Sequence, residues 1–175
     1  MQTMDNRNGF EPAPTTLQRT YPCILMLIGV GAIAMAYTAE YGYGLEPCNL
    51  CLAQRVPYAL IALVGWALYR RPHWMAPGNL TAVGAGLFLI GALIAVYHVG
   101  VEQHWWVSAA GCGGTSGQAI DASQLLQSLQ QKPPKACDEV DWTLFGLSMA
   151  TYNAFFSFVW AGITFKIAQR LWRTS

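Results

Sequence analysis

The residues most able to do chemistry lie within one short segment, Glu46–Arg55, which holds two closely spaced cysteines and an arginine. Cys48 and Cys51 form a Cys-x-x-Cys pair, and Arg55 follows Cys51 by four residues. Residues four apart share one face of a helix. On a helix that begins here, we expect the positive end of the helix dipole and the guanidinium to lower the pKa of the Cys51 thiol. The spacing therefore predicts a reactive cysteine pair.

The elements that must position this pair are membrane-spanning helices. The uncharged run after Arg55, residues 56–69, has only 14 residues, fewer than the ~20 that a helix needs to cross a bilayer. A spanning helix that ends there must therefore begin near residue 50. The cysteine pair then lies at one membrane surface, with Arg55 about one turn inside. An ionisable group inside a span is a candidate functional residue; the alternative is that its long side chain reaches back to the headgroups.

The composition places the whole chain in the membrane class. Its 175 residues are 54% hydrophobic and 11% charged, whereas a soluble domain carries about 25% charged residues. Three further runs without Asp, Glu, Lys or Arg cover residues 20–39, 72–101 and 142–165. We therefore predict an all-α, integral-membrane four-helix bundle. The predicted spans are about 21–39, 50–69, 78–97 and 142–165, in one domain of residues 21–166 between tails 1–20 and 167–175.

The distribution of basic residues predicts which side of the membrane each end faces. One side carries seven cations: Arg7, Arg19, Arg70, Arg71, Lys166, Arg170 and Arg173. The other side carries Lys132 and Lys135 against seven acidic residues. Because cytoplasmic loops are rich in Lys and Arg, we predict that both termini are cytoplasmic and that two loops, with the cysteine pair, face the opposite compartment. The net charge of +1, without a basic patch, argues against a nucleic-acid partner.

The second outer loop, residues 103–141, supplies another pair of cysteines. Cys112 and Cys137 are separated by 24 residues. Between them, apolar residues at helical spacing over 121–131 predict a short amphipathic helix, which either lies on the membrane or packs on the other loop. Cys23, at the cytoplasmic start of the first span, is expected to be a small buried apolar residue.

His98 and Glu102 end the third span at the same membrane level as Arg55, and their spacing of four residues puts them on one helix face. His98 is a candidate site residue. The alternative is an interfacial histidine that hydrogen-bonds a neighbouring carbonyl. For Glu102 the alternative is the solvated end of a helix.

Three interpretations of the four outer cysteines compete. In the first, two disulfides staple the loops, although a Cys-x-x-Cys ring is too small to constrain the unfolded chain much. In the second, four thiolates bind zinc, but such motifs usually contain two close pairs and this chain has one, so we predict no metal site. In the third, the loop pair exchanges disulfides with a soluble protein and the membrane-level pair passes electrons into the bilayer. A quinone is the natural lipid-soluble acceptor, with Arg55 and His98 polarising its carbonyl oxygens.

The residues that favour the third interpretation resemble one known family. Cys48-Asn49-Leu50-Cys51 followed by Gln54-Arg55, Tyr97-His98, Cys112, and Cys137 leading into Asp141-Trp142-Thr143-Leu144-Phe145-Gly146-Leu147 look like the disulfide-bond formation protein B (DsbB) family. The resemblance covers about 22–166. It implies a thiol:quinone oxidoreductase of the bacterial inner membrane that oxidises a periplasmic thioredoxin-like (DsbA-type) protein and reduces ubiquinone or menaquinone.

The resemblance also implies a role for each matching residue. Cys112 would be attacked by the partner thiolate, and Cys137 would then exchange with Cys48. Cys51 would be left as a thiolate against the quinone, with Arg55 stabilising that pair. His98 matches a histidine that contacts quinone.

One position departs from the family pattern. Gln54 stands where some members of the family carry an acid, so we expect that Glu102 takes any proton-handling role. Two alternatives stay open: a specialised paralogue that oxidises a dedicated partner, and a non-catalytic membrane scaffold with disulfide-stapled loops.

Overall fold

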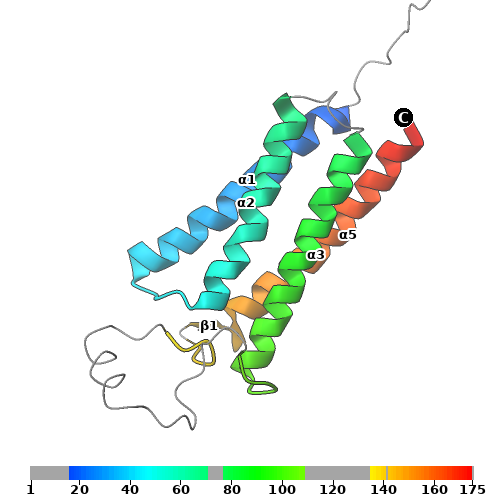
Figure 1. Ribbon diagram of the computed structural model, residues 1–175. Coiled ribbons are helices and arrows are strands. Elements are labelled where there is room, and N and C mark those ends of the chain that lie inside the picture. The colour runs from blue at the N-terminus through cyan, green and yellow to red at the C-terminus, as the bar shows by residue number, and fades with distance from the viewer. Residues whose placement is uncertain (1–15, 71–76, 109–134, 141, 175) are drawn as a thin grey trace, which may run out of the picture.

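A computed structural model of the chain describes residues 16–70, 77–108, 135–140 and 142–174. Within these residues, four long helices lie side by side and a small hairpin precedes the last of them (Figure 1). The elements are α1 (Thr16–Tyr37), the π-helical turn η1 (Thr38–Gly42), α2 (Asn49–Arg70), α3 (Pro77–Glu102), β1 (Thr143–Leu144), β2 (Leu147–Ser148) and α5 (Met149–Thr174). The predicted all-α four-helix bundle is confirmed.

The lengths and apolar surfaces of the helices fit a membrane protein. Three helical segments are long and apolar enough to cross a bilayer: Thr20–Gly42, Asn49–Arg70 and Pro77–Glu102. The fourth helix, α5, has 26 residues, as many as α3. Large side chains such as Leu27, Met35 and Phe155 point outward and are 72–76% exposed, as expected where lipid takes the place of water. The side of the membrane that each end faces stays a prediction.

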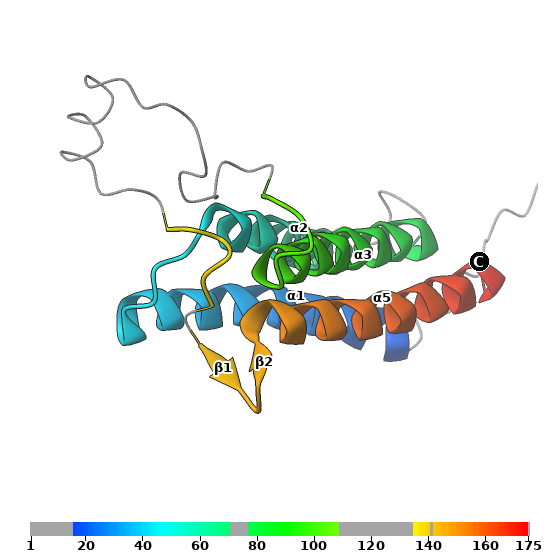
Figure 2. The same cartoon turned by 90° about the horizontal axis from the view of Figure 1, so that it is seen from below.

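The bundle is held together by packing between consecutive helices. α1 packs on α2, α2 on α3, and α3 on α5, and Figure 2 shows α2 and α3 in one layer over α1 and α5. The core between them includes Leu25, Ile61 and Phe88, all at most 1% exposed. Near the end of the bundle where the chain enters α1, the Tyr21 hydroxyl donates a 2.7 Å hydrogen bond to Thr164 and joins α1 to α5.

Two helices pack closely because glycine removes the intervening side chain. A Cβ at Gly29 of α1 would lie 2.5 Å from the Tyr58 carbonyl oxygen of α2, and one at Gly65 would lie 2.8 Å from the Pro22 carbonyl oxygen.

Cys23, on the same helix as Gly29, is exposed. The prediction that Cys23 is buried is therefore wrong, because it lies on the outward face of α1.

The last span begins later than predicted. The sequence analysis started it at residue 142, but residues 143–148 form an antiparallel hairpin and α5 begins at Met149. The turn of this hairpin is Phe145-Gly146, with φ angles of 50° and 78°, a conformation that glycine adopts without steric cost. α3 in turn continues to Glu102, past the predicted end at 97. The amphipathic helix predicted over 121–131 lies outside the described residues.

Candidate active site

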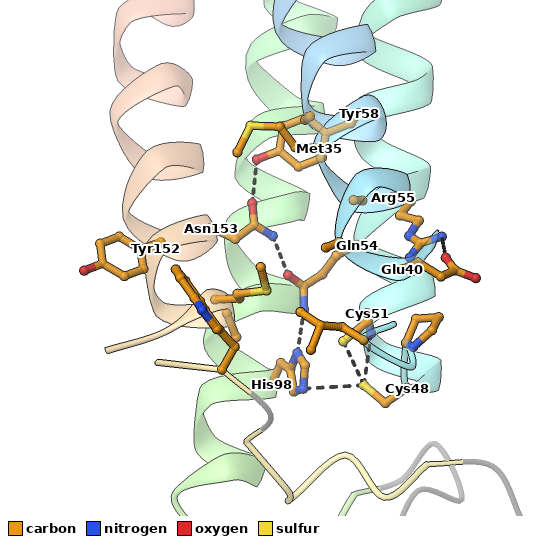
Figure 3. Close-up of a pocket in the computed structure, with 18 of the residues that line it drawn as sticks. Met35, Glu40, Cys48, Cys51, Gln54, Arg55, Tyr58, His98, Tyr152 and Asn153 are labelled. Atoms are coloured by element: carbon orange, nitrogen blue, oxygen red, sulfur yellow. Dashed lines mark hydrogen bonds and ion pairs between the residues drawn. The ribbon is translucent and has the colours of Figure 1, made fainter. Parts of the chain in front are cut away.

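Three of the predicted site residues meet at the end of the bundle where α2 begins and α3 ends. Cys48 directly precedes α2, Cys51 lies in its first turn, and His98 lies in the last turns of α3. The two sulfur atoms are 3.0 Å apart, and the Cys48 Sγ is 3.6 Å from the His98 Nε2 (Figure 3). Cys48 and His98 are both buried. The cysteine pair and the histidine therefore form one compact cluster.

Cys48 acts as the cap of α2. Its sulfur accepts a 3.3 Å hydrogen bond from the Cys51 backbone N–H, and its carbonyl oxygen accepts one from the Leu52 N–H. The first N–H groups of a helix have no partner within the helix, so a side-chain acceptor at this position stabilises the start of α2. The positive end of the helix dipole also favours a negative charge on this sulfur.

The thiol with the low pKa is Cys48. The hydrogen bond with Cys51 is the main cause, burial opposes it, and the hydrogen bond with His98 adds to it; together they lower the pKa of Cys48 to about 4. The sequence analysis expected such an environment at Cys51 through Arg55. The structure differs because the groups that stabilise the thiolate, the neighbouring sulfur and the imidazole, converge on Cys48.

The Arg55 guanidinium is held by α1. It forms a 2.7 Å ion pair with Glu40 and lies over the Tyr37 ring, 5.0 Å from its centroid. Glu40 belongs to η1, whose wider turn continues α1 at the level of Arg55. Wide turns of this kind are often found at functional sites. Sequence reasoning missed this pair, because it treated Glu40 only as a charge of the outer side.

A row of polar side chains runs from His98 into the bundle (Figure 3). The Gln54 Nε2 is 2.7 Å from the His98 Nδ1, and the Gln54 Oε1 accepts a hydrogen bond from the Asn153 Nδ2 of α5. The Asn153 Oδ1 in turn accepts one from the Tyr58 hydroxyl. In this arrangement the Gln54 amide N–H donates to Nδ1, and the ring proton then lies on Nε2, facing Cys48.

Asn153 and Tyr58 were not predicted as site residues. The available signal was the lone amide of Asn153 within the uncharged run 142–165. A polar group buried at membrane depth requires a hydrogen-bonding partner, and such residues are often functional.

Glu102 lies on the other side of His98. Its Oε1 is 3.8 Å from the His98 Nε2, and its Oε2 accepts a hydrogen bond from the Ser148 hydroxyl. Ser148 also accepts a bond from the Thr151 N–H and so caps α5. The Glu102 side chain is only 6% exposed, so the alternative of a solvated helix end is wrong.

A cavity of about 820 Å³ opens beside the cluster. Cys48, Cys51, Arg55 and His98 line its polar end. Its other walls come mainly from apolar side chains of α1 and α5, and they include the outward-facing residues Leu27, Met35 and Phe155. Because these residues face the lipid, an apolar molecule dissolved in the bilayer can reach the cysteine pair along this wall.

The described cysteines differ in their bonding. Cys23, Cys48 and Cys51 are free, whereas Cys137 is disulfide-bonded. Cys137 is 1% exposed and packs in one apolar cluster with Cys48. Cys112, predicted as the other member of the loop pair, lies outside the described residues.

Comparisons with known proteins point to one family. The model of the family described as disulfide bond formation protein DsbB matches residues 18–167. Proteins named disulfide bond formation protein B are similar to this chain: 28% identical in Acinetobacter baylyi, over 84% of this chain and 89% of that protein, and 31% identical in Dechloromonas aromatica, over 77% and 80%. The protein of that name from Hahella chejuensis is 30% identical over 82% of this chain and 91% of its own length. No solved structure matches the chain significantly.

The low pKa of Cys48 predicts a specific pH dependence. The folded value of about 4 lies below the ordinary value of about 8.5. Ionised Cys48 therefore stabilises the fold fully above about pH 8.5, and this stabilisation is lost progressively as the pH falls to about 4. In reduced protein with Cys23, Cys112 and Cys137 replaced by serine (the pair-only protein), thiolate absorbance should titrate near pH 4. Cys51→Ala should move the midpoint toward 8.5, and Cys51→Ser, which keeps a donor, should move it less. A midpoint that Cys51→Ala leaves unchanged would contradict the assignment.

The polar row predicts that α5 controls the imidazole of α3. In the reduced pair-only protein, Asn153→Leu removes the group that orients Gln54, so the His98 ring proton should distribute between Nδ1 and Nε2 and the pKa of Cys48 should rise. Nitrogen-15 chemical shifts of labelled histidine report the proton position directly. Tyr152→Phe is the matched control on α5, since the Tyr152 hydroxyl bonds only the hairpin carbonyl of Leu144 among the described contacts. Histidine shifts and a Cys48 titration that Asn153→Leu leaves unaltered would refute the role of the row.

Proposed function

This chain belongs to the DsbB family of disulfide bond formation proteins, and from that premise we propose that it is a thiol:quinone oxidoreductase of the bacterial inner membrane. It reoxidises a periplasmic, thioredoxin-like DsbA-type protein and delivers the electrons to ubiquinone or menaquinone. The observation that carries the proposal is the free Cys48–Cys51 pair at the polar end of a cavity whose apolar wall reaches the lipid.

The cavity fits a quinone by size and chemistry. Its volume of about 820 Å³ lies in the range of small-molecule sites, which are mostly apolar with a few convergent polar groups. Arg55 and His98 are the donors that would hold the headgroup oxygens. A bound quinone accepts two electrons and two protons, the number that two thiols release when they form a disulfide.

The chain's own residues supply the disulfide exchange. The partner thiolate attacks Cys112, breaking its bond to Cys137 and forming a mixed disulfide. The second partner thiolate then attacks the partner sulfur of this mixed disulfide, which forms the partner disulfide and releases Cys112 as a thiolate. The released Cys137 thiolate attacks Cys48, breaking the inner disulfide and freeing Cys51. Cys112 next displaces Cys48, so the loop disulfide forms again and the inner pair holds both electrons.

Two observations support this order. Cys137 packs in the same apolar cluster as Cys48, which suits a direct exchange between them. The lowered pKa of Cys48 makes it a good leaving group, because a thiol of low pKa leaves a disulfide faster.

Glu102 is the residue we assign to proton transfer. Gln54 cannot titrate, and its side chain hydrogen-bonds the Nδ1 of His98. The Glu102 carboxylate lies 3.8 Å from the nitrogen that faces Cys48. We therefore assign the uptake of the protons that leave the thiols to Glu102, while the Nε2–H of His98 stabilises the Cys48 thiolate.

The alternatives have less support. A scaffold with stapled loops requires inert disulfides, whereas the Cys-x-x-Cys pair is free and its first thiol has a lowered pKa. A specialised paralogue with a dedicated partner would share the chemistry, and it is distinguished by which dithiol protein the chain oxidises.

The proposal predicts turnover that needs both cysteine pairs. Purified protein mixed with a reduced thioredoxin-like dithiol protein should reduce quinone, followed by absorbance. Cys51→Ser and Cys112→Ser should each lower the rate at least a hundredfold, because each removes a cysteine from one of the two pairs that pass the electrons on. Cys23→Ser is the matched control and should keep the wild-type rate, since Cys23 lies on the outward face of α1. Full turnover in Cys51→Ser or in Cys112→Ser would overturn the proposal. So would the absence of turnover in the wild-type protein with both quinone types.

A further inference from the structure

The reduced cysteine pair and His98 form a cluster suited to a metal ion. The two Sγ atoms and a ring nitrogen of His98 all lie within 4.8 Å of one another. Thiolate sulfur and imidazole nitrogen are the ligands that Zn²⁺ takes in proteins. The sequence predicted no metal site, because it offered only one close cysteine pair. The fold supplies the third ligand from α3, 50 residues beyond Cys48.

The distances approach those of a tetrahedral site. With Zn–S of about 2.3 Å and Zn–N of about 2.0–2.1 Å, a sulfur and a nitrogen on one ion stand roughly 3.6 Å apart and two sulfurs roughly 3.8 Å. The Cys48 Sγ and the His98 Nε2 are 3.6 Å apart, and the two sulfurs are 3.0 Å apart. Binding therefore requires the Cys51 side chain, which is only partly buried, to move by about 0.8 Å.

Gln54 provides the support that a metal-binding histidine needs. Such a histidine usually donates its other ring N–H to an oxygen, and Gln54 is 2.7 Å from the His98 Nδ1. Turning the Gln54 and Asn153 amides exchanges donors and acceptors along the row. The Gln54 oxygen then accepts from Nδ1–H, and the Tyr58 oxygen accepts from the Asn153 amide. The row thus accommodates the ring with its proton on Nδ1, which frees Nε2 for a metal.

Charge favours a cation at this point. Two thiolates and the Glu102 carboxylate would place three negative charges around one buried position, and a divalent ion offsets two of them. The Glu102 Oε1 lies 3.8 Å from the His98 Nε2 but is not among the three ligand atoms that lie within 4.8 Å of one another, so it contributes negative charge beside the site. The Arg55 charge does not compete, because it is paired with Glu40.

We propose that the reduced Cys48–Cys51 pair, with His98, is a binding site for Zn²⁺ and related soft divalent ions. Binding releases the thiol proton that remains on the pair to the solvent, and no electrons are transferred. Its regulatory meaning rests on the proposed function: the metal holds both thiolates and prevents them from forming the disulfide, so quinone reduction stops until the ion is removed. The binding itself does not depend on any quinone chemistry.

Cadmium titration of the full-length pair-only protein tests the site. The protein is reduced with a phosphine in detergent, and the thiolate-to-cadmium ultraviolet absorption is followed, with a competing chelator to obtain the Kd. We expect one Cd²⁺ per chain and no specific binding in Cys51→Ser. His98→Leu should weaken binding at least tenfold. His104→Leu is the matched control, because His104 is 74% exposed and pairs with Asp138. Equal affinity in His98→Leu and His104→Leu would overturn the proposal.

A second measurement needs no substitution at the proposed ligands. On addition of Zn²⁺ to the pair-only protein with labelled histidine, the nitrogen-15 shifts of His98 should change to those of a ring with Nδ1 protonated and Nε2 bound to metal, while His73 and His104 stay unchanged. Unchanged His98 shifts at saturating Zn²⁺ would exclude the histidine as a ligand.

These results separate the metal site from the proposed function. Binding that depends on His98 supports the site even where the turnover assay fails. If the protein turns over but metal binding does not depend on His98, the metal-site proposal is wrong and the oxidoreductase proposal is unaffected. In wild-type protein, we expect Zn²⁺ to stop quinone reduction and a chelator to restore it; undiminished turnover at saturating Zn²⁺ would refute the regulatory role.

Discussion

The hydrogen bonds that converge on the Cys48 sulfur are the interaction on which the site depends. This sulfur caps α2, accepts from the neighbouring cysteine and lies against the His98 ring of α3. One atom therefore joins the start of one helix to the end of another. The same contacts lower the pKa of the thiol to about 4, so the geometry that holds the end of the bundle together also activates the cysteine.

Burial in an apolar bundle explains why the supporting groups come as a connected row. Each polar group at membrane depth needs a partner, and Gln54, Asn153 and Tyr58 satisfy one another between His98 and the core. The row links α2, α3 and α5, while the ion pair of Arg55 with Glu40 links α2 to α1. The four helices thus surround the cavity with fixed polar groups at one end and lipid-facing apolar walls elsewhere.

Local patterns in the sequence predicted the bundle and most of the site, and non-local contacts account for what they missed. Uncharged runs located the helices, and the Cys-x-x-Cys spacing of Cys48 and Cys51 indicated a reactive pair. The partners of Arg55 and Gln54 come from other helices, so spacing within one segment did not reveal them. The run from residue 142 carries no charge up to residue 165, so the charge pattern could not distinguish its first residues, a hairpin that turns at Phe145-Gly146, from helix.

The claim that this cavity receives a quinone is tested most directly by labelling the purified protein with a photoreactive quinone and identifying the modified peptides. The account predicts labels on the cavity walls, in α1 near Met35 and in α5 near Tyr152, which ordinary quinone prevents by competition. Leu93 of α3 is 56% exposed and is not part of the cavity wall, so it reports labelling from the lipid. Labels concentrated around Leu93, or an extent of labelling that ordinary quinone does not diminish, would contradict the account.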